Sequence, residues 1–305
     1  TAFDDPHIFD HVPFDPSCPA CKRAKARVAG QLKMRDKDAK EKERAKVPGE
    51  RQIMDLCGPF PNSPKQENYM FVSVDDATDL FYLHPLNGKT PAGVVRAIAK
   101  FKQLTDEFCE WKKLPRAHIW KLKSDLGSEF IAERTKEIIA DNFGVQEFVP
   151  KDRHVSRVEN VIRKVCNGAR ALLSDAGLPA KLWSFAALTY CHNRNISDVD
   201  GWAEFLESKR MLNERVVFGE LGFCKLADNL QATSKSAEKG APIVYLGPCL
   251  DMKKGANIVY LTASGDRKGK YSHTTCIHRG ISWPKKRRHA FERVYKDLVT
   301  ISAPG

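Results

Sequence analysis

Residues 53–104 read IMDLCGPFPNSPKQENYMFVSVDDATDLFYLHPLNGKTPAGVVRAIAKFKQL, and this stretch decides the fold. It contains three short apolar runs, at 53–57, 69–74 and 80–86, which Gly, Pro and Asn bound as they bound buried strands. The period then changes, because apolar residues recur every three or four positions after Thr90-Pro91. Thr at an N-cap followed by Pro is a typical helix start. The stretch therefore predicts three strands followed by an amphipathic helix.

The next hundred residues continue this alternation. Residues 117–124 and 145–149 read as a fourth and a fifth strand. The turn at Gly127-Ser128 predicts a helix between them, with Ile131, Ile138, Ile139 and Phe143 as its apolar residues. A last helix has an apolar stripe at Val155, Val158, Ile162, Val165, Ala169 and Leu172. Strands and helices in this order predict an α/β protein with a mixed five-stranded sheet flanked by helices.

Changes in composition divide the chain into six predicted parts. A His/Cys element at 1–21 precedes a basic linker at 22–51, which is nearly free of large apolar side chains. An α/β core is predicted at 52–177 and a helical extension at 178–215. Short apolar runs between Gly-rich turns predict a small β-barrel at 216–291, and residues 292–305 form a tail.

The overall composition excludes several classes of protein. The chain has 305 residues, 42% of them hydrophobic and 29% charged, which excludes a fully disordered chain and a coiled coil. We see no apolar run near the length of a membrane span and no leader of the signal-peptide type. The first residue is Thr, which suggests a fragment or a processed product. A net charge of +12 favours nucleic acid as the partner.

Three acidic residues stand where local structure explains them poorly. Asp55 interrupts an apolar strand, Asp125 ends the fourth strand, and Glu159 borders the apolar stripe of the last helix. If the strands are neighbours and the helix crosses their ends, the three carboxylates converge on a site for Mg²⁺, which prefers hard oxygen ligands. Two such ions support in-line phosphoryl transfer. The alternative is that the two aspartates form turns and that Glu159 is a solvated helix residue.

The motifs around these carboxylates resemble those of a known family. Asp55 to Pro59, Ser124 to Phe130 and Arg157 to Asn160 resemble, in this order, the three acidic motifs of retroviral-type integrases, specifically those of copia-type retrotransposons. The resemblance extends over about residues 50–290. It implies an RNase-H-like core in which the three carboxylates hold Mg²⁺ or Mn²⁺. Such a core trims the 3′ ends of element DNA and joins them to target DNA, as a multimer on the DNA.

Basic residues near Glu159 are candidates for contact with DNA. Arg163 and Arg170 follow Glu159 by four and eleven residues, on the same helix face, and Lys151 and Arg153 precede the helix. The alternative for Arg163 is an ordinary ion pair with Glu159. The family usually has Asn-Gly in the loop before its Glu, whereas residues 151–156 read KDRHVS here, and the 33 residues between Asp125 and Glu159 form a slightly short interval.

The N-terminus contains the spacing His7-x3-His11-x6-Cys18-x2-Cys21. Two imidazoles and two thiols are the ligand set of a tetrahedral structural zinc site, and the C-x2-C spacing lets both thiolates reach one ion. The pattern resembles the N-terminal zinc element of integrases, although the gap between His11 and Cys18 is too short for a helical zinc bundle and fits a knuckle-like loop. The alternative is two unrelated histidines beside a C-x2-C without metal.

The remaining signals concern location and the class of function. Nine cysteines with one close pair indicate a reduced intracellular protein. The run Pro284 to Arg288 is typical of a nuclear-import signal or of a phosphate-binding tail, and the alternative is a solvated charge run. An import signal would place the protein in the nucleus at the time of integration. The leading hypothesis is the integrase of a retrotransposon polyprotein. The alternatives are an inactive or domesticated DNA-binding remnant and a nuclease of the RNase H type.

Overall fold

The computed structural model describes residues 6–25, 44–114, 120–125, 127–141, 144–149, 156–225, 241–249, 252–261, 271–277 and 280–283. The chain forms two compact units. Unit 1 comprises Thr1–Ala24, Gly168–Asn193 and Leu206–Gly305, and unit 2 comprises Lys25–Asn167 and Arg194–Phe205. This division differs from the sequence-based boundaries in two places. Residues 168–177, the end of the predicted core, belong to unit 1, and residues 194–205 of the predicted helical extension belong to unit 2.

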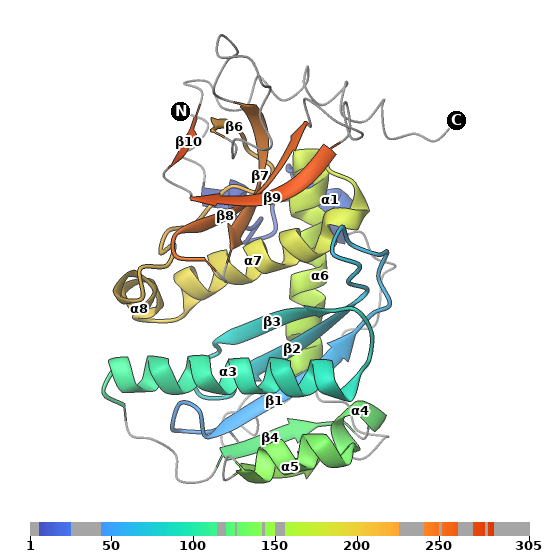
Figure 1. The fold of residues 1–305 in the computed structure, drawn as a ribbon, viewed down its shortest axis with the longest axis vertical. Helices are drawn as coiled ribbons and strands as arrows, with labels where there is room; N and C mark the ends of the chain where they lie inside the picture. The colour runs from blue at the N-terminus through green and yellow to red at the C-terminus, as the bar shows by residue number, and fades with distance from the viewer. Residues whose placement is uncertain are drawn as a thin grey trace. The chain divides into compact units, whose positions relative to one another are not determined.

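Unit 2 is built on a mixed five-stranded sheet (Figure 1). Its strands are β1 (Arg51–Cys57), β2 (Tyr69–Asp75), β3 (Phe81–Leu86), β4 (Trp120–Ser124) and β5 (Gly144–Phe148), in the order β3-β2-β1-β4-β5. Neighbours among β1, β2 and β3 run antiparallel, whereas β4 is parallel to both β1 and β5. The predicted α/β class and mixed sheet are confirmed. The start of the predicted fourth strand, at 117–119, lies outside the described residues.

Helix α3 (Pro91–Trp111) covers one face of this sheet and contributes much of its core. Its N-cap is Thr90, as predicted, and the Thr90 hydroxyl accepts a hydrogen bond from the Gly93 amide. The buried side chains of the helix pack with alternate residues of the strands. This core consists of Met54, Phe71, Leu86, Val94, Ala97, Ile98, Trp120, Leu122, Phe130 and Ile139.

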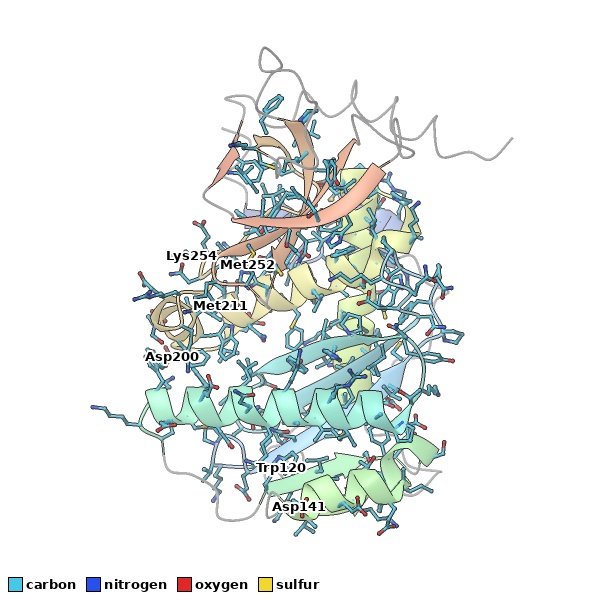
Figure 2. All side chains as sticks on the ribbon, viewed as in Figure 1. Trp120, Asp141, Asp200, Met211, Met252 and Lys254 are labelled. Atoms are coloured by element: carbon cyan, nitrogen blue, oxygen red, sulfur yellow. The ribbon has the colours of Figure 1, made fainter. Side chains whose placement is uncertain are left out.

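The segment after β4 differs from the prediction of one helix. It forms α4 (Ser128–Ile131) and α5 (Glu133–Asp141), separated at Ala132, whose extended backbone breaks the helical path. Ile131 is 41% exposed rather than packed, while Ile139 is buried as predicted. The break places Ile131 in α4 and Ile139 in α5, so a single helical period does not relate the two side chains. Figure 2 labels Trp120 in β4 and Asp141 at the end of α5.

The predicted linker at 22–51 is shorter than expected at both ends. Residues as far as Lys25 belong to helix α1 (Pro19–Lys25). Residues 44–50 are bound to the sheet of unit 2, since the Ala45 amide donates to Asp76 at 2.8 Å and the Gly49 amide donates to Asp75 at 2.8 Å. The buried aspartates need these donors, which draw the segment onto the fold. Residues 26–43 lie outside the described part of the chain.

Helices occupy the predicted extension at 178–215, as α7 (Trp183–Asp198) and α8 (Trp202–Ser208). The part of this extension that belongs to unit 2 is held to the end of α3 by an aromatic cluster of Phe108, Trp111, Trp202 and Phe205. The Lys112 ammonium also donates to the backbone and the carboxylate of Asp200, both at 2.7 Å. Asp200 is labelled in Figure 2. Tertiary packing therefore assigns this segment to the core.

Unit 1 contains an antiparallel sheet in the order β10-β6-β7-β8-β9. The strands are β6 (Leu221–Cys224), β7 (Ala241–Cys249), β8 (Gly255–Leu261), β9 (Tyr271–Ile277) and β10 (Ile281–Ser282). The thiol of Cys224 on β6 and the thiol of Cys276 on β9 lie close enough to shift each other's pKa, although β7 and β8 stand between these strands in the sheet, so the sheet is curled. Closure into a barrel stays a prediction, and Pro284 to Arg288 and the tail lie outside the described residues.

The packing of α7 on β7 depends on Gly247. Its φ is +104°, a conformation that favours glycine, and a Cβ there would lie 1.9 Å from Oγ1 of Thr189 on α7. Thr189 is buried, and its hydroxyl donates to Leu246 at 3.2 Å. We therefore expect Gly247→Ala to lower the free energy of unfolding by about 2–4 kcal/mol, measured by urea unfolding.

The double variant Gly247→Ala/Thr189→Ala separates the two causes. Removal of the threonine hydroxyl relieves the clash but leaves the strained φ, so we expect part of the stability to return. A Gly247→Ala variant as stable as the unmodified chain contradicts the close approach.

No helix in the part of the chain that the structure describes is long and apolar enough to cross a membrane.

Candidate active site and metal centre

The two strand-borne aspartates lie on the sheet face opposite α3. Met54 on β1 and Leu122 on β4 belong to the core beneath α3. Because successive side chains of a strand point to opposite faces, Asp55 and residue Lys123 face the other way, and Asp125 follows Lys123 by two positions. The alternation that buries the core thus places both carboxylates on one face.

Strand pairing also sets the two aspartates side by side. β1 and β4 are parallel neighbours, and Ile53 pairs with Lys123. Asp55 and Asp125 each follow that pair by two residues, and neighbouring strands are about 4.8 Å apart. The Asp125 carboxylate also accepts a hydrogen bond from the Gly127 amide at 3.0 Å, which fixes it in the turn that starts α4.

Glu159 joins the two aspartates from the first turn of helix α6 (Ser156–Ala176). The pKa of Asp55 is raised to about 6, first by burial and then by the negative charges of Asp125 and Glu159. The Leu56 amide, which donates to Asp55 at 2.7 Å, and the Lys89 ammonium oppose this shift of the pKa. The three predicted carboxylates therefore lie near enough to interact electrostatically.

The carboxylates are not gathered as tightly as the ligands of one ion. Among the described residues, the group of His, Cys, Asp or Glu whose ligand atoms all lie within 4.8 Å of one another is His7, His11, Cys18 and Cys21. Asp55 is half-buried and Asp125 is exposed, so solvent reaches the trio. Their oxygen donors are the type that Mg²⁺ and Mn²⁺ prefer.

Two basic residues beside the trio were missed in the sequence. Lys89 acts on Asp55 electrostatically and precedes the cap of α3. Arg157 binds the carboxylates of Asp76 and Asp79, which follow β2. Arg157 stands two positions before Glu159 within its motif, which was the only available signal, since the aspartates that it binds are about eighty positions away in the chain.

The predicted DNA-contact residues are described only in part. Arg163 and Arg170 are exposed on α6, and Arg163 donates to the side chain of Asn160 one turn before it. Arg170 falls in unit 1, whereas Glu159 falls in unit 2. Lys151 and Arg153 lie outside the described residues.

The His/Cys cluster is assembled from the segment 6–25. His7 lies in a short 3-10 helix (Pro6–Ile8), and Cys21 lies in the first turns of α1. His7 Nε2 is 3.2 Å from His11 Nδ1 and 3.3 Å from Cys21 Sγ, while His11 Nδ1 is 3.6 Å from Cys18 Sγ. The short loop between His11 and Cys18 brings the four side chains together without a helical bundle, for which it is too short.

These spacings fit a tetrahedral zinc ion. Zinc binds imidazole nitrogen at about 2.0–2.1 Å and thiolate sulfur at about 2.3 Å, so that two ligand atoms of a tetrahedron are about 3.3–3.8 Å apart. The measured nitrogen–nitrogen and nitrogen–sulfur distances of 3.2, 3.3 and 3.6 Å agree with this geometry. His11 and Cys21 are fully buried, as structural ligands are. The donor set and its geometry therefore fit zinc.

The cluster is docked on the rest of unit 1. The buried amide of Asn193 on α7 donates to the Phe9 carbonyl at 2.6 Å and to the Val216 carbonyl at 2.8 Å. The Arg215 guanidinium lies 4.7 Å from the centre of the Phe9 ring. Arg23 of α1 donates to Ser174 of α6 at 2.6 Å. The N-terminal element is thus a packed part of unit 1.

Asp175 of α6 supports one of the four candidate ligands. Its carboxylate lies 4.0 Å from His11 Nε2, while Nδ1 of the same ring faces Cys18 and His7. A histidine that binds metal through one nitrogen usually directs its other N–H to a carboxylate, which fixes the tautomer and the ring orientation. The Asp175 carboxylate lies near that second nitrogen of His11, at an ion-pair distance that is longer than a hydrogen bond.

The raised pKa of Asp55 predicts a pH-dependent stability. Between about pH 4 and pH 6 the folded chain holds a proton on Asp55 that the unfolded chain has lost. The contribution of this group to stability therefore falls as the pH rises through that window and is level above it. In metal-free protein at pH 7.5, we expect Asp55→Asn to raise the free energy of unfolding by about 1–3 kcal/mol.

Urea unfolding of both proteins at pH 4.5 and pH 7.5 measures this difference. Asp106→Asn, at a half-exposed position paired with Lys102, is the control for loss of one carboxylate. Equal pH dependence in the unmodified chain and in Asp55→Asn contradicts the shifted pKa.

Comparison with known proteins found no matching family model and no matching curated protein. Among solved structures, the catalytic core domain of BIV integrase is 18% identical, with a TM-score of 0.36 over 53% of this chain and 96% of that one. The HTLV-2 integrase catalytic core domain in complex with magnesium, in a trimeric form, is 16% identical, with a TM-score of 0.36 over 50% of this chain and 88% of that one. At these values the function must be argued from the side chains themselves.

Proposed function

We propose that this chain is the integrase of a retrotransposon polyprotein, which processes the 3′ ends of element DNA and joins them to target DNA. The observation that carries the proposal is the approach of three carboxylates from β1, from the end of β4 and from the first turn of α6. These are the residues that the resemblance to copia-type integrases assigns to metal binding. The strand order β3-β2-β1-β4-β5 supports an RNase-H-like core.

In this proposal Asp55, Asp125 and Glu159 hold Mg²⁺ or Mn²⁺. Two carboxylates at about 4 Å repel each other by roughly 4 kcal/mol at an effective dielectric of 20, and a cation offsets that repulsion. Divalent ions bound there supply activation of the attacking hydroxyl and stabilisation of the leaving oxygen. The chain itself orients the carboxylates through the pairing of β1 with β4 and through the first turn of α6.

A second ion, Zn²⁺, is proposed at His7, His11, Cys18 and Cys21, where it has a structural role. All four protein donors converge, which leaves no open position for substrate, as in structural rather than catalytic zinc sites. Asn193 donates to Phe9 of this element, and Arg23 of the element donates to Ser174, so that a zinc ion there would stabilise the packing of the element within unit 1.

DNA is the proposed partner, and binding as a homo-oligomer is proposed from the resemblance. The net charge of +12 favours a polyanion. Arg163 and Arg170 are exposed on α6, and guanidinium groups bind phosphates. We propose that the curled sheet of unit 1 is part of a small β-barrel and that integration takes place in the nucleus.

The test is a strand-transfer assay with Mg²⁺ or Mn²⁺ and DNA that carries the element's ends. We expect joined products from the unmodified chain and none from Asp125→Asn. DNA binding by both proteins should weaken steeply as the salt concentration rises, as phosphate neutralisation requires. A purified chain that binds DNA without joining it in either form overturns the enzymatic proposal.

That negative outcome identifies the second candidate, an inactive or domesticated DNA-binding remnant. Two observations favour it. Residues 151–156 lack the Asn-Gly that the family usually has before its glutamate. Among the described residues, the group of side chains close enough to hold a metal ion is the His/Cys cluster and not the three carboxylates.

A further inference from the structure

Five charged side chains form a network at the turn between β2 and β3, in unit 2. The network consists of Arg44, Arg51, Asp76, Asp79 and Arg157. Arg44 donates to Asp79 at 2.8 Å, and an Arg51 nitrogen lies 3.6 Å from the Asp76 carboxylate. The Asp76 side chain is only 4% exposed, so that its charge requires these partners.

Arg157 connects this network to helix α6. One of its terminal nitrogens donates to the Asp76 carbonyl at 2.9 Å and to the Asp76 carboxylate, and the other donates to the Asp79 carboxylate. A planar guanidinium that binds two acceptors fixes orientation as well as distance. Arg157 lies in the first turn of α6, two residues before Glu159.

The same network also reaches the strand that carries Asp55. Arg51 is the first residue of β1, four positions before Asp55. Asp76 therefore forms an ion pair with Arg51, on the strand that carries Asp55, and accepts a hydrogen bond from Arg157, on the helix that carries Glu159. Through these two contacts, Asp76 connects the start of α6 with the start of β1.

We propose that Arg157 is a positioning residue, which clamps the first turn of α6 to the β2–β3 turn and so holds Glu159 beside Asp55 and Asp125. This inference rests on the proposed function of the three carboxylates as metal ligands. Loss of Arg157 leaves Asp76 with Arg51 and the Ala45 amide, and leaves Asp79 with Arg44. The fold therefore keeps partners for both aspartates, while the helix start loses its anchor.

The first experiment measures Mn²⁺ affinity by calorimetry in the full chain. Changes to residues that orient metal ligands typically cost 10–100-fold in affinity. We expect Arg157→Gln to weaken Mn²⁺ binding about tenfold or more and Arg157→Lys to restore part of it. Arg44→Gln is the matched control, because it removes an arginine that binds both the Asp79 carboxylate and the Asp76 carbonyl without touching α6, and we expect a change below about twofold. Equal losses in Arg44→Gln and Arg157→Gln overturn the inference.

A double-mutant cycle tests whether Arg157 acts through Glu159. In a Glu159→Gln background, we expect Arg157→Gln to cause no further loss of Mn²⁺ affinity. Fully additive losses overturn the inference.

Hydrogen exchange tests the clamp without metal. We expect faster amide exchange in the first turns of α6 in Arg157→Gln but not in Arg44→Gln, and unchanged exchange overturns the inference. If the unmodified chain binds Mn²⁺ but does not join DNA, the proposed strand-transfer activity is contradicted, whereas the positioning role of Arg157 stands. Absence of Mn²⁺ binding by the unmodified chain overturns both.

Discussion

Asp125→Asn is expected to lower the rate of DNA joining by at least about 10³-fold, and Asp55→Asn and Glu159→Gln should do the same. Each substitution removes one anionic ligand from a set of three that approach from β1, β4 and α6. A loss of about 4 kcal/mol of transition-state stabilisation corresponds to about 10³-fold in rate. The measurement is the single-turnover rate of strand transfer at saturating Mn²⁺.

The controls separate chemistry from folding. Asp106→Asn removes a carboxylate of α3 that is bound to Lys102, and its joining rate should stay within about twofold. Asp55→Asn should unfold at higher denaturant concentration than the unmodified metal-free chain, since it removes an unfavourable buried charge. Joining that survives any of the three substitutions contradicts a shared metal site.

Removal of zinc is expected to lower the free energy of unfolding of unit 1 by about 4 kcal/mol, as much as a large-to-small substitution in its core. A ligand that binds the folded state alone contributes about 4 kcal/mol when its free concentration is a thousand-fold above its dissociation constant. The loss of stability should extend beyond the N-terminal element, because the Asn193 amide donates both to Phe9 of that element and to Val216, which precedes β6. Urea unfolding with and without a chelator, followed by zinc analysis of the purified chain, measures it.

Three variants make the zinc prediction specific. Cys21→Ser should lose the metal and become insensitive to chelator. Cys191→Ser, at a buried cysteine of α7 outside the cluster, should keep one zinc per chain and its chelator sensitivity. Asp175→Asn should weaken zinc binding about 10–100-fold, as loss of a carboxylate beside a ligating histidine does. Purification of the unmodified chain without zinc contradicts the assignment.

The alternation of apolar and polar residues made much of unit 2 predictable. It gave the three antiparallel strands, the capped helix α3 and the stripe of α6, because burial on one face imposes a period of two on strands and 3.6 on helices. Asp55, Asp125 and Glu159 were singled out from the same patterns, since Asp55 interrupts an apolar strand, Asp125 ends a strand and Glu159 borders an apolar helix stripe. The four His/Cys residues were found from spacing, because a ligand set of this type is rare by chance at such short intervals.

Other features were hidden from the sequence for identifiable reasons. The break at Ala132 and the docking of residues 44–50 depend on contacts with distant segments. The grouping of residues 194–205 with unit 2 depends on aromatic packing against α3. Lys89 carries no local signal, because a lone basic residue has no period or spacing that distinguishes it. Arg157 lies within the motif of Glu159, but nothing local indicates that it binds Asp76 and Asp79.

The sequence by itself determined which residues face the core, where helices begin, and which acidic and metal-binding side chains lack a local explanation. These properties depend on neighbours a few positions away in the chain, so a short stretch of sequence is enough to predict them. Only the tertiary structure decided that β1 and β4 place Asp55 beside Asp125, that Asp175 stands behind His11, and that Arg157 reaches Asp76 and Asp79. Those contacts join residues far apart in the chain, and they exist only because burial of the two cores brings the distant segments together.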